Sequence, residues 1–451
     1  MDLPRWWIGV LVFSFLANFS SAENVIVPGA TWTDTSGNVI QAHGGGFLKV
    51  GSTFFWFGED KSSNDLFFHA VSCYSSTDLI NWSRQNNALT PISGTMISSS
   101  NIVERPKVLF NKKNSEFVMW FHSDVSGYKS AMVGVATAKS PCGPYTYKGS
   151  WKPLGKDSRD MGLFQDAAQT SYLLYASDNN QNFKIARLDA DYHNVTTVVA
   201  TLSGSTLEAP GIIKRNNAYF LFASHTTGFA PNPNKWFQSE FVSGTWSAQS
   251  DLATPALNTF FSQNAFDMPL GSNGIYMGDR WRSTLLGSSR YMWLPIDFSS
   301  GKPKLVQADV WSVNIGAGTF SVAKGTTFEA ESGTLAGGAK LLTDSGFSAG
   351  KGVGFLGKGG TVTINNVQGN GAGQWVALYY ANGDSTWRSA TVSVNGGSTV
   401  TVDQPNTGSG HVILSVPVKL NLRSGANSIT IASNQNTFAG DLDKITVYTQ
   451  G

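Results

Sequence analysis

Apolar and polar residues follow one recurring pattern through residues 43–280 of this sequence. A polar residue and a short spacer precede an apolar strand, a turn and a second strand rich in aromatic residues. The five copies read HGGGFLKVGSTFFWFGE, ERPKVLFNKKNSEFVMWFHS, DMGLFQDAAQTSYLLYAS, EAPGIIKRNNAYFLFASH and QNAFDMPLGSNGIYMGDR. Two such strands on either side of a short polar turn are typical of a β-hairpin. The pattern therefore predicts five hairpins.

The copies recur about every 50–60 residues, which is typical of propeller blades rather than helical solenoids. Strand-rich segments such as AMVGVATAKS and FKIARLDAD lie in the intervals. Each interval can therefore supply two further strands, giving four strands per blade. We expect a five-bladed β-propeller over residues 23–319.

The polar residue that opens each copy changes from one copy to the next. In chain order these residues are His43, Glu104, Asp160, Glu208 and Gln263. A ring of blades places the innermost strand of each blade around one axis, so the five side chains should meet at one mouth of that axis. The alternative is that they are ordinary polar residues at strand starts. We favour a functional site because five positions recur in register and three carry carboxylic acids.

The character of the chain changes after Val322. Residues 320–326 form a short polar linker. Residues 327–451 are rich in glycine, and apolar and polar residues alternate there with a period of two between turns that contain glycine. This pattern predicts a β-sandwich of the jelly-roll kind, so we expect an all-β chain. The tail has no candidate nucleophile and no histidine cluster, which favours a binding or packing module.

The first 22 residues resemble a secretory signal peptide. Arg5 precedes an apolar run at residues 6–13, and the small residues Ser20 and Ala22 suit a cleavage site. The run is too short to span a bilayer, so we expect a secreted, extracellular protein without a membrane anchor. The net charge of +2 gives no electrostatic reason for binding nucleic acid or an anionic membrane.

Secretion changes the expectation for the two cysteines. Cys73 and Cys142 would lie in an oxidising compartment, where one disulfide is the favoured interpretation and two free thiols are the alternative. The sequons at Asn81 (NWS) and Asn194 (NVT) predict glycosylated, exposed turns.

Several of these segments resemble a known family. SRDMGLFQD and LEAPGIIKRNNAYFLFAS are similar to the Asp-bearing and general-acid motifs of glycoside hydrolase family 43, and HGGG with ERPKVLFN resembles its exo-β-1,3-galactanase (galactan 1,3-β-galactosidase) subgroup. The tail segments FEAESGTL, YYANG and DLDKITV resemble a family 35 carbohydrate-binding module, a pairing known among fungal enzymes. The resemblance implies a monomeric, inverting hydrolase that releases galactose from β-1,3-galactan, the backbone of arabinogalactan, without a catalytic cofactor.

The resemblance assigns roles to two of the opening residues. Glu208, followed by Ala209 and Pro210, matches the general acid, which must stay protonated to donate to the leaving oxygen. Asp160 matches the residue that raises the pKa of that acid, although it could instead be a turn cap.

The general base departs from the family pattern. Most family members carry it as an Asp on the first blade, where this chain reads His43 and three glycines. Gln263 could act as an imidic-acid base, Glu104 could be a carboxylate base, or polar groups could position the water. We favour Gln263 and assign Glu104 and Arg105 to hydrogen bonds with sugar hydroxyls.

Further binding residues follow from the same alignment of copies and from the resemblance of the tail. Substrate contacts are expected at His43, Glu59, Tyr128, Asn179, Asn180, Thr226, Asp279 and Arg280. Aromatic residues that could stack on a sugar are Trp56, Tyr128, Trp236 and Trp281. Sugar contacts of the tail are expected at Tyr380, Asn382, Asp384, Arg388 and Asn434. A structural Ca²⁺, which favours hard oxygen ligands, is expected at Glu329, Glu331 and Asp443.

Two other functions remain open at this point. One is an α-L-arabinofuranosidase or β-xylosidase of the same family, which the missing first-blade Asp disfavours. The other is a sugar-binding propeller without turnover, which the pair formed by Glu208 and Asp160 disfavours because a lectin needs no general acid.

Overall fold

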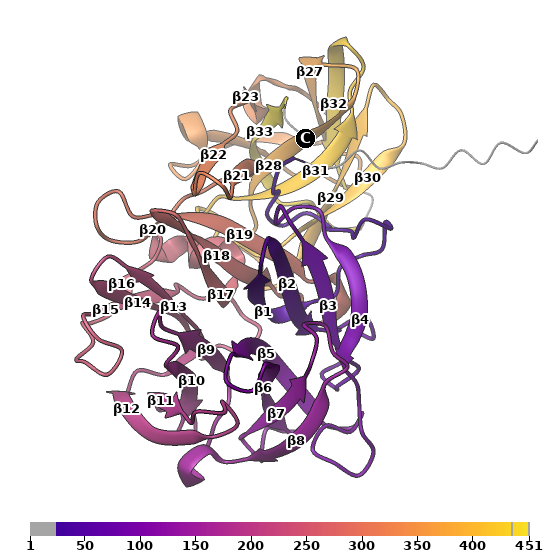
Figure 1. The fold of residues 1–451 in the computed structure, drawn as a ribbon. Coiled ribbons are helices and arrows are strands. Elements are labelled where there is room, and N and C mark those ends of the chain that lie inside the picture. Colours follow the sequence, from indigo (N-terminus) through magenta and orange to yellow (C-terminus); the bar gives the residue numbers. More distant parts are fainter. Residues whose placement is uncertain (1–23, 434–435, 450–451) are drawn as a thin grey trace, which may run out of the picture.

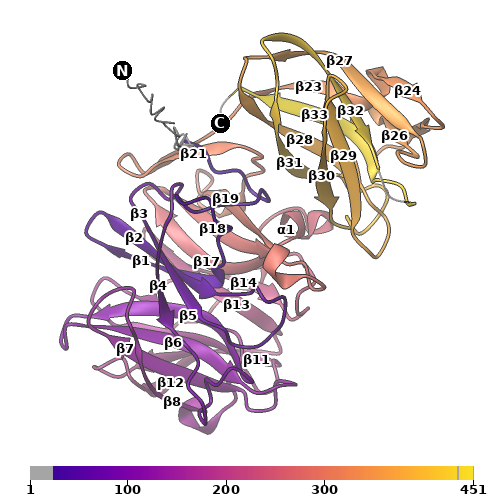
Figure 2. The same ribbon diagram turned by 90° about the vertical axis from the view of Figure 1, so that its right-hand side faces the viewer.

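The chain folds into two lobes built almost entirely of strands (Figures 1 and 2). The computed structural model describes residues 24–433 and 436–449. The expected signal peptide and Asn434 lie outside the described residues. The expectation of an all-β chain is confirmed. Within the described ranges, no helix is both long enough and apolar enough to cross a membrane.

The first lobe contains five antiparallel sheets of four strands each. The first two sheets are β1 (His43–Val50), β2 (Thr53–Glu59), β3 (Val71–Ser76) and β4 (Ser83–Leu89), then β5 (Ile102–Asn111), β6 (Glu116–Asp124), β7 (Met132–Ala138) and β8 (Thr146–Trp151). The third and fourth are β9 (Met161–Gln165), β10 (Ser171–Ser177), β11 (Asn182–Leu188) and β12 (Val195–Ser203), then β13 (Leu207–Arg215), β14 (Ala218–His225), β15 (Lys235–Ser239) and β16 (Ser250–Asp251). The fifth is β17 (Gln263–Leu270), β18 (Asn273–Arg280), β19 (Arg290–Asp297) and β20 (Lys304–Leu305).

The first strands of these sheets contact one another in a ring. Strand β1 contacts β5, β5 contacts β9, β9 contacts β13, β13 contacts β17, and β17 returns to β1. None of the described sheets closes on itself; the ring is made by packing five separate sheets around a centre (Figure 1). Each predicted hairpin is the inner pair of one sheet.

A β-bulge follows the opening polar residue in four of the five inner strands. The register shifts lie at His43–Gly46, Glu104–Lys107, Glu208–Gly211 and Asn264–Phe266. A bulge inserts an unpaired residue and turns the strand locally, so the spacer of the repeated pattern serves to re-aim the polar side chain. Three of the bulges hold a residue in the left-handed region, namely Gly44, Arg105 and Ala209.

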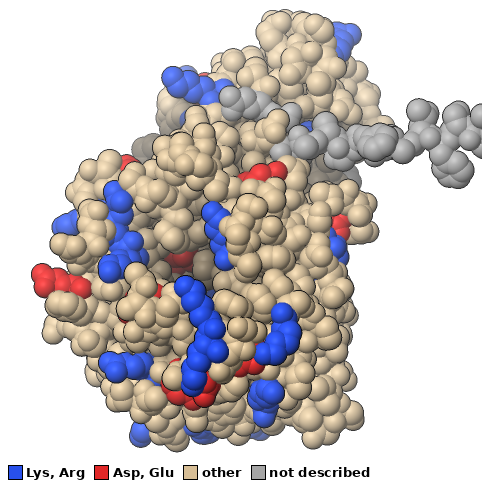
Figure 3. Space-filling model, in the orientation of Figure 1, with Lys and Arg blue, Asp and Glu red and all other residues tan. Residues whose placement is uncertain are grey.

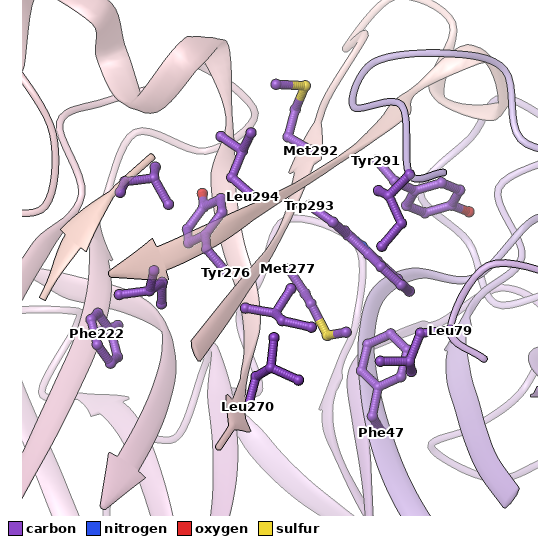
Figure 4. Close-up of a cluster of buried hydrophobic side chains, with 14 of the residues drawn as sticks. Phe47, Leu79, Phe222, Leu270, Tyr276, Met277, Tyr291, Met292, Trp293 and Leu294 are labelled. Atoms are coloured by element: carbon purple, nitrogen blue, oxygen red, sulfur yellow. The ribbon is translucent and has the colours of Figure 1, made fainter. Parts of the chain in front are cut away.

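Large aromatic side chains fill the space between the first and fifth sheets. Trp56 and Trp293 have ring centroids 4.9 Å apart, and Phe47 packs against both rings. Figure 4 shows part of this cluster, in which Trp293 lies between Tyr291, Met277 and Phe47. Two of the aromatic residues predicted to stack on sugar, Trp56 and Trp236, belong to this core and are buried.

The predicted disulfide between Cys73 and Cys142 is confirmed. It joins β3 of the first sheet to the loop after β7 of the second. Both sulfur-bearing residues are buried in the core that these two sheets share. The bridge therefore ties two neighbouring sheets together.

The second lobe contains a six-stranded and a five-stranded sheet. The first comprises β23 (Gly325–Glu329), β25 (Lys340–Thr343), β26 (Lys351–Gly354), β28 (Gly373–Ala381), β31 (Leu414–Asn421) and β33 (Asp441–Tyr448). The second comprises β24 (Thr334–Ala336), β27 (Thr361–Gly369), β29 (Arg388–Val394), β30 (Thr399–Gln404) and β32 (Gly425–Ala432). One apolar cluster runs through the lobe and includes Val376, Leu378, Ile429 and Ile445.

Short elements complete the chain. They are α1 (Asn258–Phe261), the 3₁₀ turns η1 (Pro153–Gly155), η2 (Pro255–Leu257), η3 (Leu286–Ser288), η4 (Ala330–Ser332) and η5 (Ser348–Gly350), and the hairpin of β21 (Trp311–Asn314) and β22 (Thr319–Val322). The expected linker at residues 320–326 is therefore largely structured, because it contains the end of β22 and the start of β23.

The two lobes share a packed junction. Val25 and Val310 of the first lobe form one apolar cluster with Trp375 of the second. Asp309 accepts hydrogen bonds from Ser415 and Tyr448. These contacts make the second lobe part of the folded body rather than a tethered appendage.

Candidate active site

A pocket of about 280 Å³ opens at the centre of the ring. Figure 3 shows the hollow on the face seen in Figure 1, with acidic side chains inside it. Its lining residues are Glu59, Leu66, Glu104, Arg105, His122, Tyr128, Arg159, Asp160, Asn180, Glu208, Thr226, Gly228, Phe229, Gln263 and Trp281. Four of the five residues that open the sequence repeats thus meet here, as predicted; His43 does not.

Glu208 has the environment of an acid that stays protonated. It is buried at the start of β13. Burial and the nearby charge of Asp160 raise the pKa of Glu208 to about 8, because both disfavour a second negative charge in the pocket. At neutral pH the carboxyl group therefore holds a proton that it can donate.

Arg105 connects four of the groups around the pocket. Its backbone N–H donates to Oε1 of Glu59 at 3.0 Å, and its Nε lies 2.9 Å from Oδ2 of Asp160. Nη1 donates to the carbonyl oxygen of Asn264 and Nη2 to Oε1 of Gln263. The left-handed backbone of Arg105 costs a non-glycine residue about 1–3 kcal/mol. The bulge that imposes this conformation places the guanidinium in the pocket. There it contacts three residues from the third and fifth repeats, namely Asp160, Gln263 and Asn264.

The Gln263 amide is fixed at both ends. Its Nε2 donates to Oε1 of Glu208 at 2.6 Å, and its Oε1 accepts from Arg105 at 2.6 Å and from the Trp281 indole at 2.7 Å. The two donors at Oε1 determine which end of the amide faces Glu208. Gln263 thus contacts the acid directly, whereas an inverting pair needs roughly 6.5–9.5 Å between the acid and the group that activates water.

Glu104 is an ionised carboxylate with bound partners. Tyr128 donates to its Oε1 at 2.8 Å, and Nδ1 of His122 lies 3.3 Å from its Oε2. Burial raises the pKa of a carboxyl group, but the charges of His122 and Lys61 prevail and lower the pKa of Glu104 to about 2. His122 is itself held by Asp124, and despite burial these carboxylates raise the pKa of His122 to about 9.

The carboxylates around His122 do not form a suitable cation site. Glu104, His122 and Asp160 bring ligand atoms within 4.8 Å of one another. However, a protonated His122 has no lone pair for a metal, and Arg105 already supplies positive charge beside Asp160. The group is better suited to hydrogen bonding with hydroxyls than to metal binding.

Asn264 supports the acid from behind. Its Nδ2 donates to the carbonyl oxygen of Ala209, the residue after Glu208, and to Oδ2 of Asp267 at 2.7 Å. The backbone carbonyl oxygen of Asn264 accepts a hydrogen bond from Nη1 of Arg105. Burial raises the pKa of Asp267 to about 7. Asn264 therefore fixes both the bulge that carries Glu208 and the guanidinium that holds Gln263.

Four predicted substrate contacts lie outside the pocket lining. His43 is fully buried, and its Nδ1 lies 2.9 Å from Oδ1 of Asp279. The other carboxylate oxygen of Asp279, Oδ2, accepts a hydrogen bond from the backbone N–H of Gly44. Asp279 therefore stabilises the bulge of β1, and its carboxylate is not available to bind a sugar. Arg280 is buried and donates to the carbonyl oxygen of Phe260. Asn179 accepts from Arg159 beside the pocket.

The remaining expected contacts are at the pocket. Glu59, Tyr128, Asn180 and Thr226 line it, as does Trp281. Five further residues line the pocket and were not predicted from the sequence, namely Leu66, His122, Arg159, Gly228 and Phe229. Of these five residues, only His122 could have been predicted from the sequence, because it lies at the end of the second repeat and pairs across the hairpin with Glu104.

In the second lobe, two predicted sugar contacts are inaccessible. Tyr380 is fully buried and donates to the carbonyl oxygen of Pro405, and buried Asn382 donates to the carbonyl oxygens of Thr386 and Gln404. They cannot meet a sugar because both complete the fold.

The other two described sugar contacts of this lobe remain at the surface. Asp384 is exposed and forms an ion pair with Arg388 at 2.7 Å. These two side chains are the ones that a carbohydrate could reach among the residues predicted here.

The expected calcium ligands partly converge. Ser348 donates through its hydroxyl to Oε2 of Glu329 and to Oδ1 of Asp443, so these two carboxylates lie beside one another. Oε2 of Glu331 is buried without a hydrogen-bond partner. Carboxylate oxygens are the ligands that Ca²⁺ prefers, but the three residues do not form a group of close ligand atoms within the described part of the chain, so a calcium site here stays a prediction.

The pocket defines a class of protein. A protonated Glu208 and the charged Asp160 lie together in a pocket of sugar-ring size. This arrangement is typical of a carboxyl-dependent glycoside hydrolase.

Comparisons with known proteins identify the family. The profile of glycosyl hydrolases family 43, whose members have a β-propeller fold, matches residues 23–261. The chain belongs to this family. A second profile, described as the CBM13 domain of alpha-galactosidase, matches residues 361–447, so the second lobe contains a carbohydrate-binding module and the family 35 assignment is not confirmed. No curated protein matches the chain.

Several solved structures are similar over most or part of the chain. An exo-β-1,3-galactanase from Phanerochaete chrysosporium, solved with galactose, is 70% identical with a TM-score of 0.93, over 94% of this chain and 100% of that one. An exo-β-1,3-galactanase from Clostridium thermocellum is 28% identical with a TM-score of 0.64, over 94% and 100%. A putative exo-β-1,3-galactanase from Bifidobacterium bifidum is 32% identical with a TM-score of 0.60, over 63% and 97%.

Proposed function

We propose that this protein is an exo-acting hydrolase that releases galactose from β-1,3-galactan with inversion. The observation that carries the proposal is the raised pKa of Glu208, about 8, beside Asp160. The 70% identical galactanase, which was also solved with β-1,3-galactotriose as a variant of one glutamate, supports the substrate.

Glu208 and Asp160 divide the acid chemistry between them. The Glu208 proton passes to the glycosidic oxygen as the bond from that oxygen to C1 breaks. A water attacks C1 from the opposite face and loses a proton to the base, which gives the α-anomer of galactose. Asp160 keeps Glu208 protonated until the step occurs.

For the base we propose Gln263, with Glu104 as the alternative. A pKa of about 2 makes Glu104 a weak base. At Gln263, Arg105 and Trp281 donate to Oε1, so Nε2 is the end of the amide that faces Glu208. Nε2 would accept a proton from water in the imidic-acid form, in which one amide proton has moved to Oε1, and loss of that Oε1 proton would then restore the amide. In this proposal, an entering sugar breaks the hydrogen bond between Gln263 and Glu208, and water occupies the space between them.

The pocket volume supports exo action. A space of about 280 Å³ is slightly below the range of roughly 300–1,000 Å³ that is usual for drug-sized ligands. One terminal sugar fits such a pocket better than an internal stretch of polysaccharide. Glu104, Arg105 and Tyr128 would then hydrogen-bond its hydroxyls.

We also propose the finer architecture. The ring of five sheets is interpreted as a five-bladed propeller over residues 23–319, and the two sheets over residues 327–451 as a β-sandwich. The motifs FEAESGTL and YYANG favour family 35 for this module. Glu329, Glu331 and Asp443 would hold Ca²⁺, which EDTA should remove with a drop in melting temperature.

The remaining expectations concern processing. Residues 1–22 would be removed on secretion, and Asn81 and Asn194 would carry glycans. We expect a monomer that acts on arabinogalactan outside the cell and does not bind nucleic acid or membrane.

One digestion tests the proposed function. β-1,3-Galactan is incubated with the protein, and products are separated by chromatography while proton NMR follows the first-formed anomer. Galactose as the first product, in the α-form, is expected. Larger oligosaccharides or the β-form would contradict exo action or inversion. Aryl arabinofuranoside and xyloside test the alternative activities, and binding without product would indicate a lectin.

A further inference from the structure

A second cavity lies between the two lobes and is separate from the active-site pocket. Its volume is about 250 Å³, and the two share no lining residue. The first lobe contributes Arg280 and Arg290, and the second contributes Trp375, Trp387, Asp403 and Lys419. Nothing in the proposed galactanase chemistry uses this cavity.

Arg280 is a buried cation that forms no ion pair with a described carboxylate. It lies at the end of β18 and is 3% exposed. Its Nη2 donates to the carbonyl oxygen of Phe260 at 2.8 Å, and its Nε has no hydrogen-bond partner. Gly29 has a φ of +79°, and a Cβ there would lie 2.8 Å from Nη1, so glycine leaves the guanidinium its space.

Arg290 faces the same cavity and is half-buried, and the charge of Asp403 compensates it only in part. Its Nη1 donates to the carbonyl oxygens of Ser288 and Ser289. The carboxylate at the cavity, Asp403, is bound by Arg282 at 2.6 Å. Across the described residues, neither Arg280 nor Arg290 forms an ion pair with a carboxylate. Burial lowers the pKa of both guanidinium groups, because the charged form is less well solvated at buried Arg280 and at half-buried Arg290.

The other wall of the cavity suits a sugar ring. Trp375 and Trp387 supply aromatic surface, and Nε1 of Trp375 is buried without a hydrogen-bond partner. Buried indole N–H groups usually have an acceptor, so this donor points to a polar ligand group. A volume of about 250 Å³ accommodates one ring rather than a chain.

We propose that this cavity binds an acidic sugar, a pyranose that carries a carboxylate. The carboxylate binds Arg280 and Arg290, because a guanidinium fork pairs with two carboxylate oxygens. The ring packs on the surface that Trp375 and Trp387 present to the cavity. A polysaccharide with acidic residues would thus be held at the lobe junction as well as at the active site.

Isothermal titration of the full chain tests the proposal with three probes. Methyl β-D-glucuronide carries both ring and charge, methyl β-D-glucoside carries the ring alone, and acetate carries the charge alone. We expect the glucuronide to bind at least tenfold more tightly than either control, and its affinity to fall as salt rises. Equal affinity for the glucoside or acetate, or no glucuronide binding at millimolar concentration, would overturn the proposal.

Substitutions then locate the site. Arg290→Gln removes the guanidinium charge but keeps a polar side chain, and it should weaken glucuronide binding about tenfold or more, as expected for a lost charge-assisted hydrogen bond. Arg187→Gln removes an equal charge from the exposed surface of β11 and should leave binding unchanged. Glu208→Gln should also leave it unchanged, which separates this site from the active site. Unaltered affinity in Arg290→Gln, or a loss in Glu208→Gln, would refute the assignment.

Discussion

The side-chain amide nitrogen of Gln263 lies 2.6 Å from Oε1 of Glu208, so the acid and the proposed base are in direct contact. Arg105 and Trp281 fix the other end of the same amide. A substrate must therefore replace one short hydrogen bond while two others keep the Gln263 carbonyl in place. This relationship makes the two residues interdependent, and the first two predictions concern them.

Glu208→Gln should lower galactose release by about 10²–10⁴-fold while the protein remains folded, because an amide cannot donate the proton that the leaving oxygen needs. Reducing-sugar assays measure the rate, and circular dichroism checks the fold. Glu240→Gln, an exposed glutamate beyond β15, is the matched control and should retain full activity. A Glu208 variant with a substantial residual rate would exclude Glu208 as the acid.

Gln263→Ala should lower kcat far more than it changes KM if Gln263 activates the water, because the lost interaction belongs to the transition state. Glu104→Gln should mainly raise KM, and azide should have no effect on it. Steady-state kinetics with and without azide distinguish the two. If azide restores the rate of the Glu104 variant, Glu104 is the base; if both variants are fully active, neither residue is.

Asp160→Asn should shift the alkaline limb of the pH–activity profile to lower pH. Activity requires protonated Glu208 and is lost as the pH rises through its pKa, about 8. Removing the Asp160 charge lowers that pKa, so the limb moves toward acid. Asp157→Asn, outside the pocket, should leave the limb in place. A limb unchanged in Asp160→Asn would show that burial alone sets the pKa of Glu208.

Asp384→Ala should weaken retention on long galactan without slowing hydrolysis of soluble oligosaccharides. Asp384 is on the surface of the second lobe, and two linked sites increase retention only on a polymer that reaches both. Pull-down on insoluble galactan measures retention. Asp344→Ala, at another turn of the same lobe, controls for loss of a surface charge. Equal retention of the two variants would place the sugar site elsewhere.

Replacing Cys73 and Cys142 together by alanine should lower the free energy of unfolding by about 2–5 kcal/mol. The bridge closes a segment with a sequence separation of 69 residues, and opening it enlarges the unfolded ensemble. Urea denaturation measures the change, which reducing agent should reproduce in the unaltered protein. An unchanged midpoint of the urea denaturation curve would mean that the bridge does not contribute to stability and that the packed core between the first two sheets holds them together without it.

The sequence pattern predicted the parts of the site that depend on position along a hairpin. The opening residues of the repeats, Glu104, Asp160, Glu208 and Gln263, meet because an inner strand brings its start to the mouth of the ring. The pattern could not show which way each side chain points after a bulge. At His43 the bulge turns the imidazole toward Asp279, while Glu59 from the neighbouring strand reaches the pocket instead.

Predictions also failed where both faces of a strand are covered. In β28, Tyr379 contacts Asp309 of the first lobe, while Tyr380, which was expected to meet sugar, faces the core of its own lobe with Val376 and Leu378. Alternation alone cannot reveal a second covered face. Arg280 failed for the same reason, since the lobe junction that encloses it joins residues distant in sequence.

The bulge after the opening residue has a consequence for how such an enzyme changes over time. Because the extra residue absorbs the local irregularity, the apolar alternation further along the strand keeps its register whichever side chain precedes it. A mutation at one of these positions can therefore alter the chemistry at the mouth with little penalty to folding. The four inner strands that carry a bulge can therefore accept different side chains at the mouth, and specificity can change one position at a time.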